Sequence, residues 1–307
     1  MKYLVTGGAG FIGSHIARTL LQQGGQVRIL DNFSSGKREN LKGLDLELIE
    51  GDLRDASKVA QAVKGVEIIF HEAAFVSVPE SMEKPQECFD VNITGTSILF
   101  DAARKAGVRR VVIASSAAVY GDSDSMPLVE ETPLRQLSPY AVSKQVAEMY
   151  AELFTHQFGL EVAALRYFNV YGPRQRPDSM YAAAVPIFIR RMLDNKPISI
   201  FGDGGQSRDQ INVLDVVQDT LLASQHPAAP GQIFNVCTGV ETRLLDLIDI
   251  LYEFFPNAPK YVHAEPRAGD IYRSIGTPKK AMDTLGFKPQ ITLADGLFEA
   301  VESMRNA

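Results

Sequence analysis

The sequence contains little cysteine, no excess of basic residues and no long apolar run. Cys88 and Cys237 are its only cysteines and lack the spacing of a metal site, so we expect free thiols in a reducing cytoplasm. A formal net charge of −6 without a long basic run argues against nucleic acid and anionic membrane surfaces as partners. No stretch is apolar for long enough to span a bilayer, and the first expected strand begins so early that we expect no signal peptide.

The rest of the composition is that of a globular α/β protein. The 307 residues, 45% of them hydrophobic, suffice for one large or two modest domains. Apolar strands alternate with helical stretches in the first half, which predicts a Rossmann-type, doubly wound parallel sheet. The expected strands are Lys2–Thr6, Gln26–Leu30, Leu46–Glu50, Glu67–His71, Arg110–Ala114 and Glu161–Arg166. The expected helices are Ser14–Gln23, Ala56–Val63, Pro85–Ala106 and Pro139–Phe158.

The alternation becomes less regular after residue 170. A loop-like segment, Gly172–Tyr181, is followed by a helix at Ala183–Leu193, a strand at Ile198–Phe201 and a helix at Asn212–Ser224. We therefore predict a larger domain over residues 1–170 and a smaller α/β substrate domain over 171–307, with some segments of the second part returning to the first.

A glycine-rich turn directly follows the first strand. Gly7, Gly10 and Gly13 keep this turn tight, let the backbone approach a pyrophosphate and place it at the positive end of the next helix. Asp31, at the end of the second strand, is placed to accept hydrogen bonds from adenosine ribose hydroxyls and to repel a 2′-phosphate. The pattern favours NAD over NADP, although Lys37 and Arg38 nearby could accommodate that phosphate.

Two further elements indicate acid–base chemistry at a hydroxyl group. Tyr140 and Lys144 are four residues apart on an expected helix, so both face the same way, and the ammonium should favour the phenolate. The tyrosine could then act as a base near neutral pH. Ser115 and Ser116 follow a strand at the carboxyl edge of the sheet, where ligands bind, and Ser116 could either relay a substrate proton or cap a helix.

These motifs, in this order, resemble the extended short-chain dehydrogenase/reductase family, and within it the NAD-dependent sugar-nucleotide 4-epimerases. The resemblance covers nearly the whole chain. It is carried by Thr6–Gly13, Asp31–Asn32, Gly51–Leu53, His71–Ala74, Asn92, Ser115–Gly121, Tyr140–Lys144, Arg166–Pro173, Ser207–Asp209 and Arg267–Asp270.

The resemblance implies NAD as cofactor, a UDP-sugar as substrate and a homodimer joined through two long helices. It implies catalytic roles for Ser116, Tyr140 and Lys144. The implied cofactor-binding residues are Gly7, Gly10, Phe11, Ile12, Gly13, Asp31, Asn32, Asp52, Leu53, Ala73, Ala74, Asn92, Ser115, Tyr140, Lys144, Tyr167 and Phe168. The implied substrate-binding residues are Ser77, Ser116, Tyr140, Asn169, Ala184, Val185, Arg208, Arg267 and Ser274.

Neighbouring residues narrow the reaction and the substrate. Related dehydratases and decarboxylases carry acidic residues after the strand-end serine or threonine, where this chain has Ala117 and Ala118. A reaction that only removes and returns a hydride therefore fits better than elimination or decarboxylation. Ser274 occupies a position at which a bulky aromatic residue excludes N-acetyl sugars in some relatives. We expect a 4-epimerase acting on UDP-N-acetylglucosamine and UDP-N-acetylgalactosamine, and on UDP-glucose and UDP-galactose. A UDP-glucuronate 4-epimerase and a non-catalytic NAD-sensing protein are the alternatives.

Overall fold

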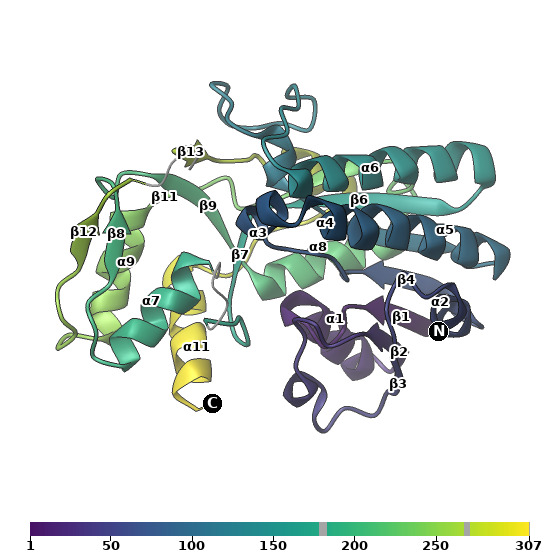
Figure 1. Cartoon of the computed structure of the whole chain (residues 1–307), viewed down its shortest axis with the longest axis horizontal. Helices are drawn as coiled ribbons and strands as arrows, with labels where there is room; N and C mark the ends of the chain where they lie inside the picture. Colours follow the sequence, from purple (N-terminus) through teal and green to yellow (C-terminus); the bar gives the residue numbers. More distant parts are fainter. Residues whose placement is uncertain (178–182, 267–270, 307) are drawn as a thin grey trace.

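A parallel sheet with helices on both faces forms the larger part of the molecule (Figure 1). The computed structural model describes residues 1–177, 183–266 and 271–306. Seven strands pair in the order β10-β6-β5-β4-β1-β2-β3, and every pairing is parallel. The strands are β1 (Lys2–Thr6), β2 (Gln26–Asp31), β3 (Glu47–Glu50), β4 (Ile68–His71), β5 (Arg110–Ser116), β6 (Glu161–Tyr167) and β10 (Ile233–Val236). The order reverses between β1 and β4, which is where α/β sheets bind ligands.

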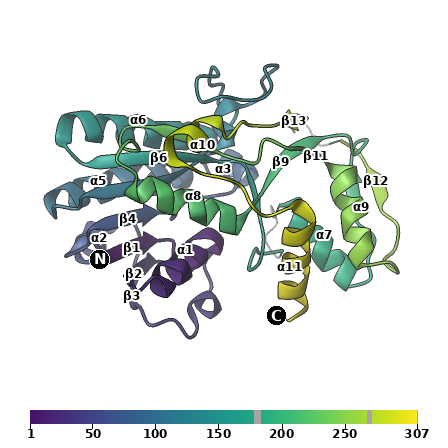
Figure 2. The same cartoon turned by 180° about the vertical axis from the view of Figure 1, so that it is seen from behind.

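Helices cover the two faces of this sheet and bury its alternating side chains. One face packs on α1 (Phe11–Gln22), α8 (Val213–Gln225) and α10 (Lys279–Leu285), which are visible from behind in Figure 2. The other face packs on α2 (Ala56–Val63), α5 (Gly95–Lys105) and α6 (Pro139–Phe158). Two buried apolar clusters result, one on each side, as expected for a sheet covered on both faces. None of the described helices is long and apolar enough to cross a membrane.

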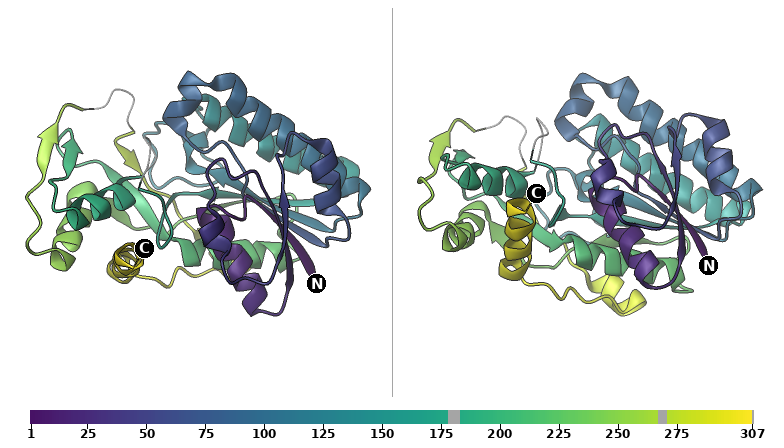
Figure 3. Two further views of the ribbon diagram at one scale, coloured as in Figure 1. Left: turned by 60° about the horizontal axis from the view of Figure 1, so that its bottom comes forward. Right: turned by 90° about the horizontal axis from the view of Figure 1, so that it is seen from below.

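The smaller part lies beyond the carboxyl ends of these strands (Figure 3). A four-stranded sheet is built around β9 (Ser207–Asn212), which pairs with β7 (Asn169–Tyr171), β11 (Glu241–Arg243) and β13 (Arg273–Ser274). A two-stranded sheet joins β8 (Ser199–Phe201) to β12 (Val262–Ala264). The helices α7 (Ala184–Leu193), α9 (Leu244–Phe254) and α11 (Leu293–Arg305) share a third apolar cluster. The chain returns to the large sheet at α8, β10 and α10.

Several element boundaries differ from the sequence prediction. The helix expected over Pro85–Ala106 is divided into α4 (Pro85–Phe89), a π-helical segment (Asp90–Thr94) and α5. A short helix, α3 (Val78–Glu83), precedes it and was not predicted. The first helix starts at Phe11 rather than at Ser14, because Gly10 already serves as its N-cap. β5 and β6 run on to Ser116 and Tyr167, so the serine pair ends a strand instead of following one.

Candidate active site

The glycine turn after β1 is packed so closely that it requires residues without a Cβ atom. Gly7 has a φ of +67°, and a Cβ atom there would lie 2.7 Å from the backbone nitrogen of Ala73. A Cβ on Gly13 would collide with the carbonyl oxygen of Gly7. Gly10 caps α1 without a side chain, so the free backbone N–H groups at Phe11 and beyond point toward the turn. The turn therefore fits a dinucleotide pyrophosphate.

The carboxylate of Asp31 connects the glycine turn to the loop after β2. Its Oδ2 accepts from Ala9 N at 2.9 Å and its Oδ1 from Phe33 N at 2.8 Å, in a site where only 6% of Asp31 is exposed. Each oxygen can accept a second hydrogen bond, so the predicted ribose contact is compatible with this geometry. Asn32 Nδ2 donates to Asp52 Oδ2 at 2.8 Å, which brings two predicted adenosine contacts together.

A buried histidine fixes the strand ends at the point where the strand order reverses. His71 Nδ1 lies 2.7 Å from Thr6 Oγ1 of β1, and His71 Nε2 lies 2.9 Å from Thr96 Oγ1 of α5. Burial lowers the pKa of His71 to about 3, so the ring is neutral. A small hollow opens beside it, and predicted cofactor residues line it: Ala73, Ala74, Asn92 and Lys144.

Tyr140, Lys144 and Ser116 converge at the carboxyl end of β5, as predicted. The Ser116 hydroxyl lies close enough to the Tyr140 hydroxyl to favour its phenolate, and Ser116 Oγ accepts from Ala118 N at 3.2 Å. Ser116 thus serves both as a cap and as the partner of the tyrosine. Lys144 Nζ lies 5.6 Å from the centre of the Tyr140 ring and donates to Ala114 O at 2.8 Å. The phenol of Tyr140, the hydroxyl of Ser116 and the ammonium of Lys144 therefore lie close to one another.

Without a bound cofactor, burial has a larger influence on the pKa of Tyr140 than the neighbouring Lys144, and the predicted ionisation beside a nicotinamide stays a prediction. Burial raises the pKa of Tyr140 to about 12 and outweighs the hydrogen bond with Ser116, which favours the phenolate. Burial also lowers the pKa of Lys144 to about 8, opposed by the negative charge of Glu72. The ammonium is held by a backbone carbonyl instead of the phenol oxygen, so a further positive charge is needed to ionise Tyr140.

Two residues predicted to bind the cofactor use their side chains within the protein. Ser115 Oγ donates to Glu148 Oε1 at 2.5 Å, away from the sheet edge. Asn92 bonds with both its oxygen and its nitrogen to the backbone of Phe75, and its nitrogen donates to Ser143 Oγ at 2.9 Å. Ser143 lies on the catalytic helix, so Asn92 ties the π-helical segment to α6. Both residues position the site, and direct contacts to a cofactor stay a prediction.

Two buried aromatic residues lie at and directly after the end of β6. Tyr167 is buried and its hydroxyl donates to Glu72 Oε1 at 3.0 Å, with Thr220 Oγ1 also 3.0 Å away. Phe168 is 6% exposed and packs in a small apolar cluster. Leu53, a predicted adenine contact, is 4% exposed in the core beneath α5. The contacts that Tyr167, Phe168 and Leu53 make within the protein do not test their predicted contacts with a cofactor.

Predicted substrate residues meet on the central strand of the smaller part. Arg208 lies on β9, where Ser274 of β13 is its register partner, and Asn169 of β7 pairs with Gln210 two positions along. The Arg208 guanidinium donates to two backbone carbonyls, at 2.8 and 3.3 Å. One sheet therefore brings together three residues that are spread over more than 100 positions of the sequence.

The other predicted substrate residues are less concentrated. Ser77 caps α3, its Oγ accepting from Glu80 N at 3.1 Å, and α3 packs on α6 beside Tyr140. Ala184 begins α7, whereas the side chain of Val185 is buried in the apolar cluster of the smaller part. Arg267 lies outside the described residues.

Sequence reasoning gave no role to three charged residues around the site. Glu72 stands in the His71–Ala74 motif, and its position directly after a buried strand was a usable signal. Glu148 and Arg166 form a buried ion pair with an Nη2–Oε2 distance of 2.8 Å. A polar residue on the inner face of the catalytic helix was the signal for Glu148.

Comparison with known proteins identifies the family of the chain. Residues 3–237 match the NAD dependent epimerase/dehydratase family. The chain belongs to this family. It is 40% identical to the UDP-glucose 4-epimerase of Mycolicibacterium smegmatis over 314 residues, which cover 100% of this chain and 99% of that protein.

Solved structures of epimerases extend this agreement to three dimensions. UDP-glucose 4-epimerase from Thermotoga maritima, with UDP-glucose, has a TM-score of 0.96 at 38% identity and covers 100% of this chain and 99% of its own. UDP-N-acetylglucosamine 4-epimerase from Methanobrevibacter ruminantium, in complex with UDP-N-acetylmuramic acid, has a TM-score of 0.95 at 36% identity, with 99% and 98% covered. The chain is thus an NAD-using enzyme whose structural relatives are UDP-sugar 4-epimerases.

Proposed function

We propose that this member of the epimerase family is a UDP-sugar 4-epimerase that accepts both N-acetylhexosamines and hexoses. The observation that carries the proposal is the meeting of Tyr140, Ser116 and Lys144 at the carboxyl end of β5. Arg208, Asn169 and Ser274 on the facing sheet would hold the nucleotide diphosphate and the sugar.

Each catalytic side chain has a defined part in a reversible oxidation at C4 of the sugar. Tyr140, as the phenolate, takes the proton of the C4 hydroxyl, and Ser116 hydrogen-bonds the same oxygen. NAD, held by the glycine turn and Asp31, would supply the acceptor and donor of the C4 hydride and a positive charge that favours the phenolate. Lys144 adds a second positive charge beside the ring. After the 4-keto sugar has rotated to present its opposite face, Tyr140 returns the proton to the same oxygen. The product is therefore an isomer of the substrate.

The residues after Ser116 favour epimerisation over elimination or decarboxylation. Ala117–Tyr120 forms a short 3-10 helix without a carboxylate, and its Tyr120 hydroxyl is buried and donates to Asn235 Oδ1. A dehydratase needs a further proton donor to expel a hydroxyl, and none is offered by this turn. Hydride removal and return needs only the three residues named above.

The size of the residue at position 274 supports acceptance of an acetamido group. Ser274 is half-buried beside Arg208 on the substrate-facing sheet. A small side chain leaves space at C2 of the sugar, whereas a tyrosine would fill it. We predict that Ser274→Tyr lowers turnover of UDP-N-acetylglucosamine at least about tenfold and spares UDP-glucose. The measurement is kcat/KM on both sugars and on UDP-glucuronate; equal losses on the first two would reject the size gate.

Replacement of the base tests the chemistry itself. Tyr140→Phe removes the proton acceptor, so we expect turnover to fall about 100- to 10,000-fold while NAD binding is retained. Turnover is followed by separation of the two epimers, and NAD content by absorbance of the released dinucleotide. Retained turnover would remove Tyr140 from its role, and preferred turnover of UDP-glucuronate would replace the substrate assignment. NAD binding without turnover of any sugar by the parent protein would support the sensing alternative.

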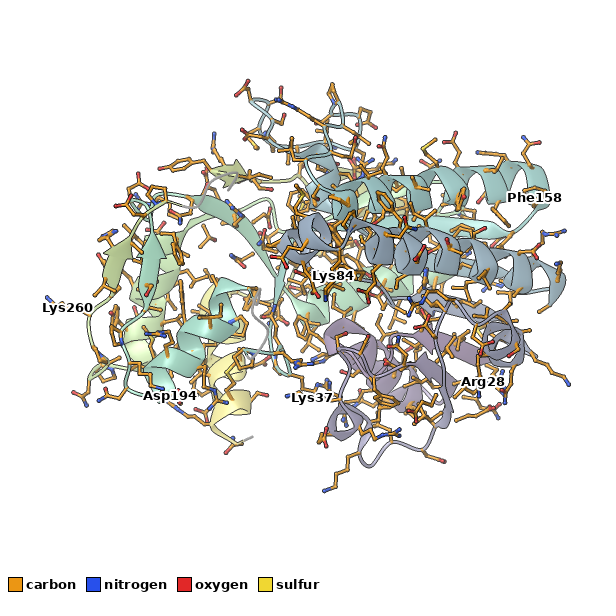
Figure 4. The ribbon with its side chains drawn as sticks, viewed as in Figure 1. Arg28, Lys37, Lys84, Phe158, Asp194 and Lys260 are labelled. Carbon is orange, nitrogen blue, oxygen red and sulfur yellow. The ribbon has the colours of Figure 1, made fainter. Side chains whose placement is uncertain are left out.

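We further propose a homodimer through the outer face of α6. Met149, Leu153 and Phe158 are 61%, 44% and 49% exposed on this helix, and Figure 4 shows Phe158 at its far end. Solvent contact of so many apolar side chains on one helix is unfavourable in a monomer. Sedimentation should give twice the mass of the chain, and Leu153→Glu should shift it toward one chain.

A further inference from the structure

The loop that follows β7, here called the bridging loop (residues 172–176), runs from the smaller part of the molecule to the larger part. Gly172 begins it with a φ of +147°, and a Cβ atom there would lie 2.7 Å from Val213 Cγ1 at the start of α8. Arg174 has a φ of +69°, in the left-handed region that residues other than glycine rarely adopt. This conformation costs free energy, so contacts of the loop with its surroundings must hold it in this path.

His15 of α1 fastens the first half of the bridging loop. Its Nε2 lies 2.9 Å from Pro173 O, and its Nδ1 lies 2.6 Å from Arg174 Nη2. A carbonyl oxygen can only accept, so Nε2 carries the proton and Nδ1 accepts from the guanidinium. Burial and the charge of Arg174 lower the pKa of His15 to about 4, so the ring is neutral, as this bond requires. Only 5% of His15 is exposed, so water hardly competes for either bond.

Arg176 fastens the other end of the bridging loop. Its Nη1 donates to Ser35 O at 2.8 Å, in the loop that begins at Asp31. That loop is itself tied to the glycine turn, because Lys37 N donates to Ala9 O at 3.0 Å. The bridging loop therefore contacts both α1 and the loop after β2, the two elements that we expect to hold the pyrophosphate and the adenosine ribose of NAD.

We propose that His15 and Arg174 are positioning residues that keep NAD bound between turnovers by fastening the bridging loop to the cofactor side of the molecule. This inference rests on the proposed NAD site at the glycine turn and Asp31, and it is independent of which sugar is used. His15 lies one turn after Phe11, and the two rings meet edge to face with centroids 6.0 Å apart. The bond with Arg174 thus acts on the first turn of α1, whose N–H groups are expected to hold the pyrophosphate.

Exchange of NAD on the holoenzyme tests this inference without turnover. Holoenzyme carrying labelled NAD is mixed with an excess of unlabelled NAD, and the label that stays on the protein is followed with time. We expect Arg174→Met to release the label about 10- to 100-fold faster than the parent, because a charge-assisted hydrogen bond is lost. Arg190→Met makes the same substitution at an exposed position of α7 and should leave the release rate unchanged.

Two substitutions of His15 separate hydrogen bonding from packing. His15→Asn keeps an acceptor near the position of Nδ1, so its release rate should stay close to that of the parent. His15→Phe keeps the volume of the ring but loses both bonds, so it should release the label about as fast as Arg174→Met. Combining Arg174→Met with His15→Phe should add little, because the two residues share one interaction.

The outcomes separate this inference from the proposed function. Release at the parent rate from both the Arg174→Met and the His15→Phe proteins overturns the role of the two residues. Faster release from His15→Asn than from His15→Phe also overturns it, because that order would indicate loss of packing volume. Turnover of UDP-glucose and UDP-N-acetylglucosamine by the parent is measured separately. If the parent turns over neither sugar, the proposed function fails, while the exchange rates still decide the role of His15 and Arg174.

Discussion

Two buried polar networks lie on opposite faces of β6, and they are built in contrasting ways. Arg166 and Tyr167 are neighbours in sequence, so their side chains point to opposite sides of the sheet. Arg166 points toward α6 and meets Glu148, whereas Tyr167 points toward α8 and meets Glu72 and Thr220. One network contains both signs of charge, and the other contains acids without an adjacent cation.

The network around Arg166 is fully paired. Two guanidinium nitrogens donate to the two Glu148 oxygens at 2.8 Å each, and a third donates to the Tyr120 hydroxyl at 2.9 Å. The Tyr120 hydroxyl in turn donates to Asn235 Oδ1 at 2.6 Å. Glu148 also receives the Ser115 hydroxyl. Such a network fixes the strand end next to Ser116.

The network around Tyr167 leaves acids to titrate. Glu72 has a tyrosine partner, and burial raises its pKa to about 7. Among the described residues, neither oxygen of Asp219 has a hydrogen-bond partner, and burial raises the Asp219 pKa to about 8. Both acids change charge near neutral pH, beside the buried Tyr167 side chain. The comparison shows that complete hydrogen bonding makes the network around Arg166 rigid, whereas the acids around Tyr167, which are incompletely hydrogen-bonded, can change their charge.

Breaking the paired network should have the largest effect. Arg166→Met leaves Glu148 buried without its counter-charge, so we expect the free energy of unfolding to fall by about 3–5 kcal/mol. The measurement is urea unfolding followed by circular dichroism. Arg243→Met removes an exposed ion pair with Asp246 and should cost less than about 1 kcal/mol. Equal losses in the two variants would contradict the assigned difference between buried and exposed pairs.

Neutralising Asp219 should change how stability depends on pH. The folded pKa of Asp219 lies above its unfolded value, so its contribution to stability is complete below about pH 4 and is lost as pH rises through 8. Asp219→Asn should therefore flatten the curve of unfolding free energy against pH and be more stable than the parent at pH 9 by about 1–3 kcal/mol. Asp283→Asn, at an exposed position, should leave the curve unchanged. A parent curve without a decline between pH 4 and 9 would refute the assignment.

Removing one hydrogen bond from the second network should have the smallest effect. Thr220→Val deletes the hydroxyl next to Tyr167 but preserves the bond from Tyr167 to Glu72. We expect a loss of about 0.5–1.5 kcal/mol in unfolding free energy, with the pH limits of turnover unchanged. A shift of those limits would show that Thr220 also influences the catalytic groups.

Local signals in the sequence predicted some elements to the residue. Helix α2 runs over Ala56–Val63 and α6 over Pro139–Phe158, as expected. Asp55 caps the first with bonds from Ser57 N and Lys58 N, Ser138 caps the second, and Gly159 ends it in the left-handed conformation. These signals lie within a few residues of the boundary, so they do not depend on the rest of the fold.

Other features depend on contacts that no local pattern contains. The π-helical turn at Asp90–Thr94 turns Asn92 inward toward Ser143, 51 residues later. Ser115 carried a predicted cofactor role, but its hydroxyl meets Glu148 on a different element. The predicted lowering of the Tyr140 pKa counted a neighbouring lysine and did not count burial, which is the larger influence.

The sequence by itself determined the alternation of strands and helices, the glycine turn, the acidic end of β2 and the Tyr140–Lys144 pair, because each depends on spacing along one strand or helix. The tertiary structure alone decided which polar groups are desolvated and which charges face each other. Desolvation and charge interaction depend on distance in space, and Glu72 meets Tyr167 only when β4 and β6, with β5 between them, form one sheet.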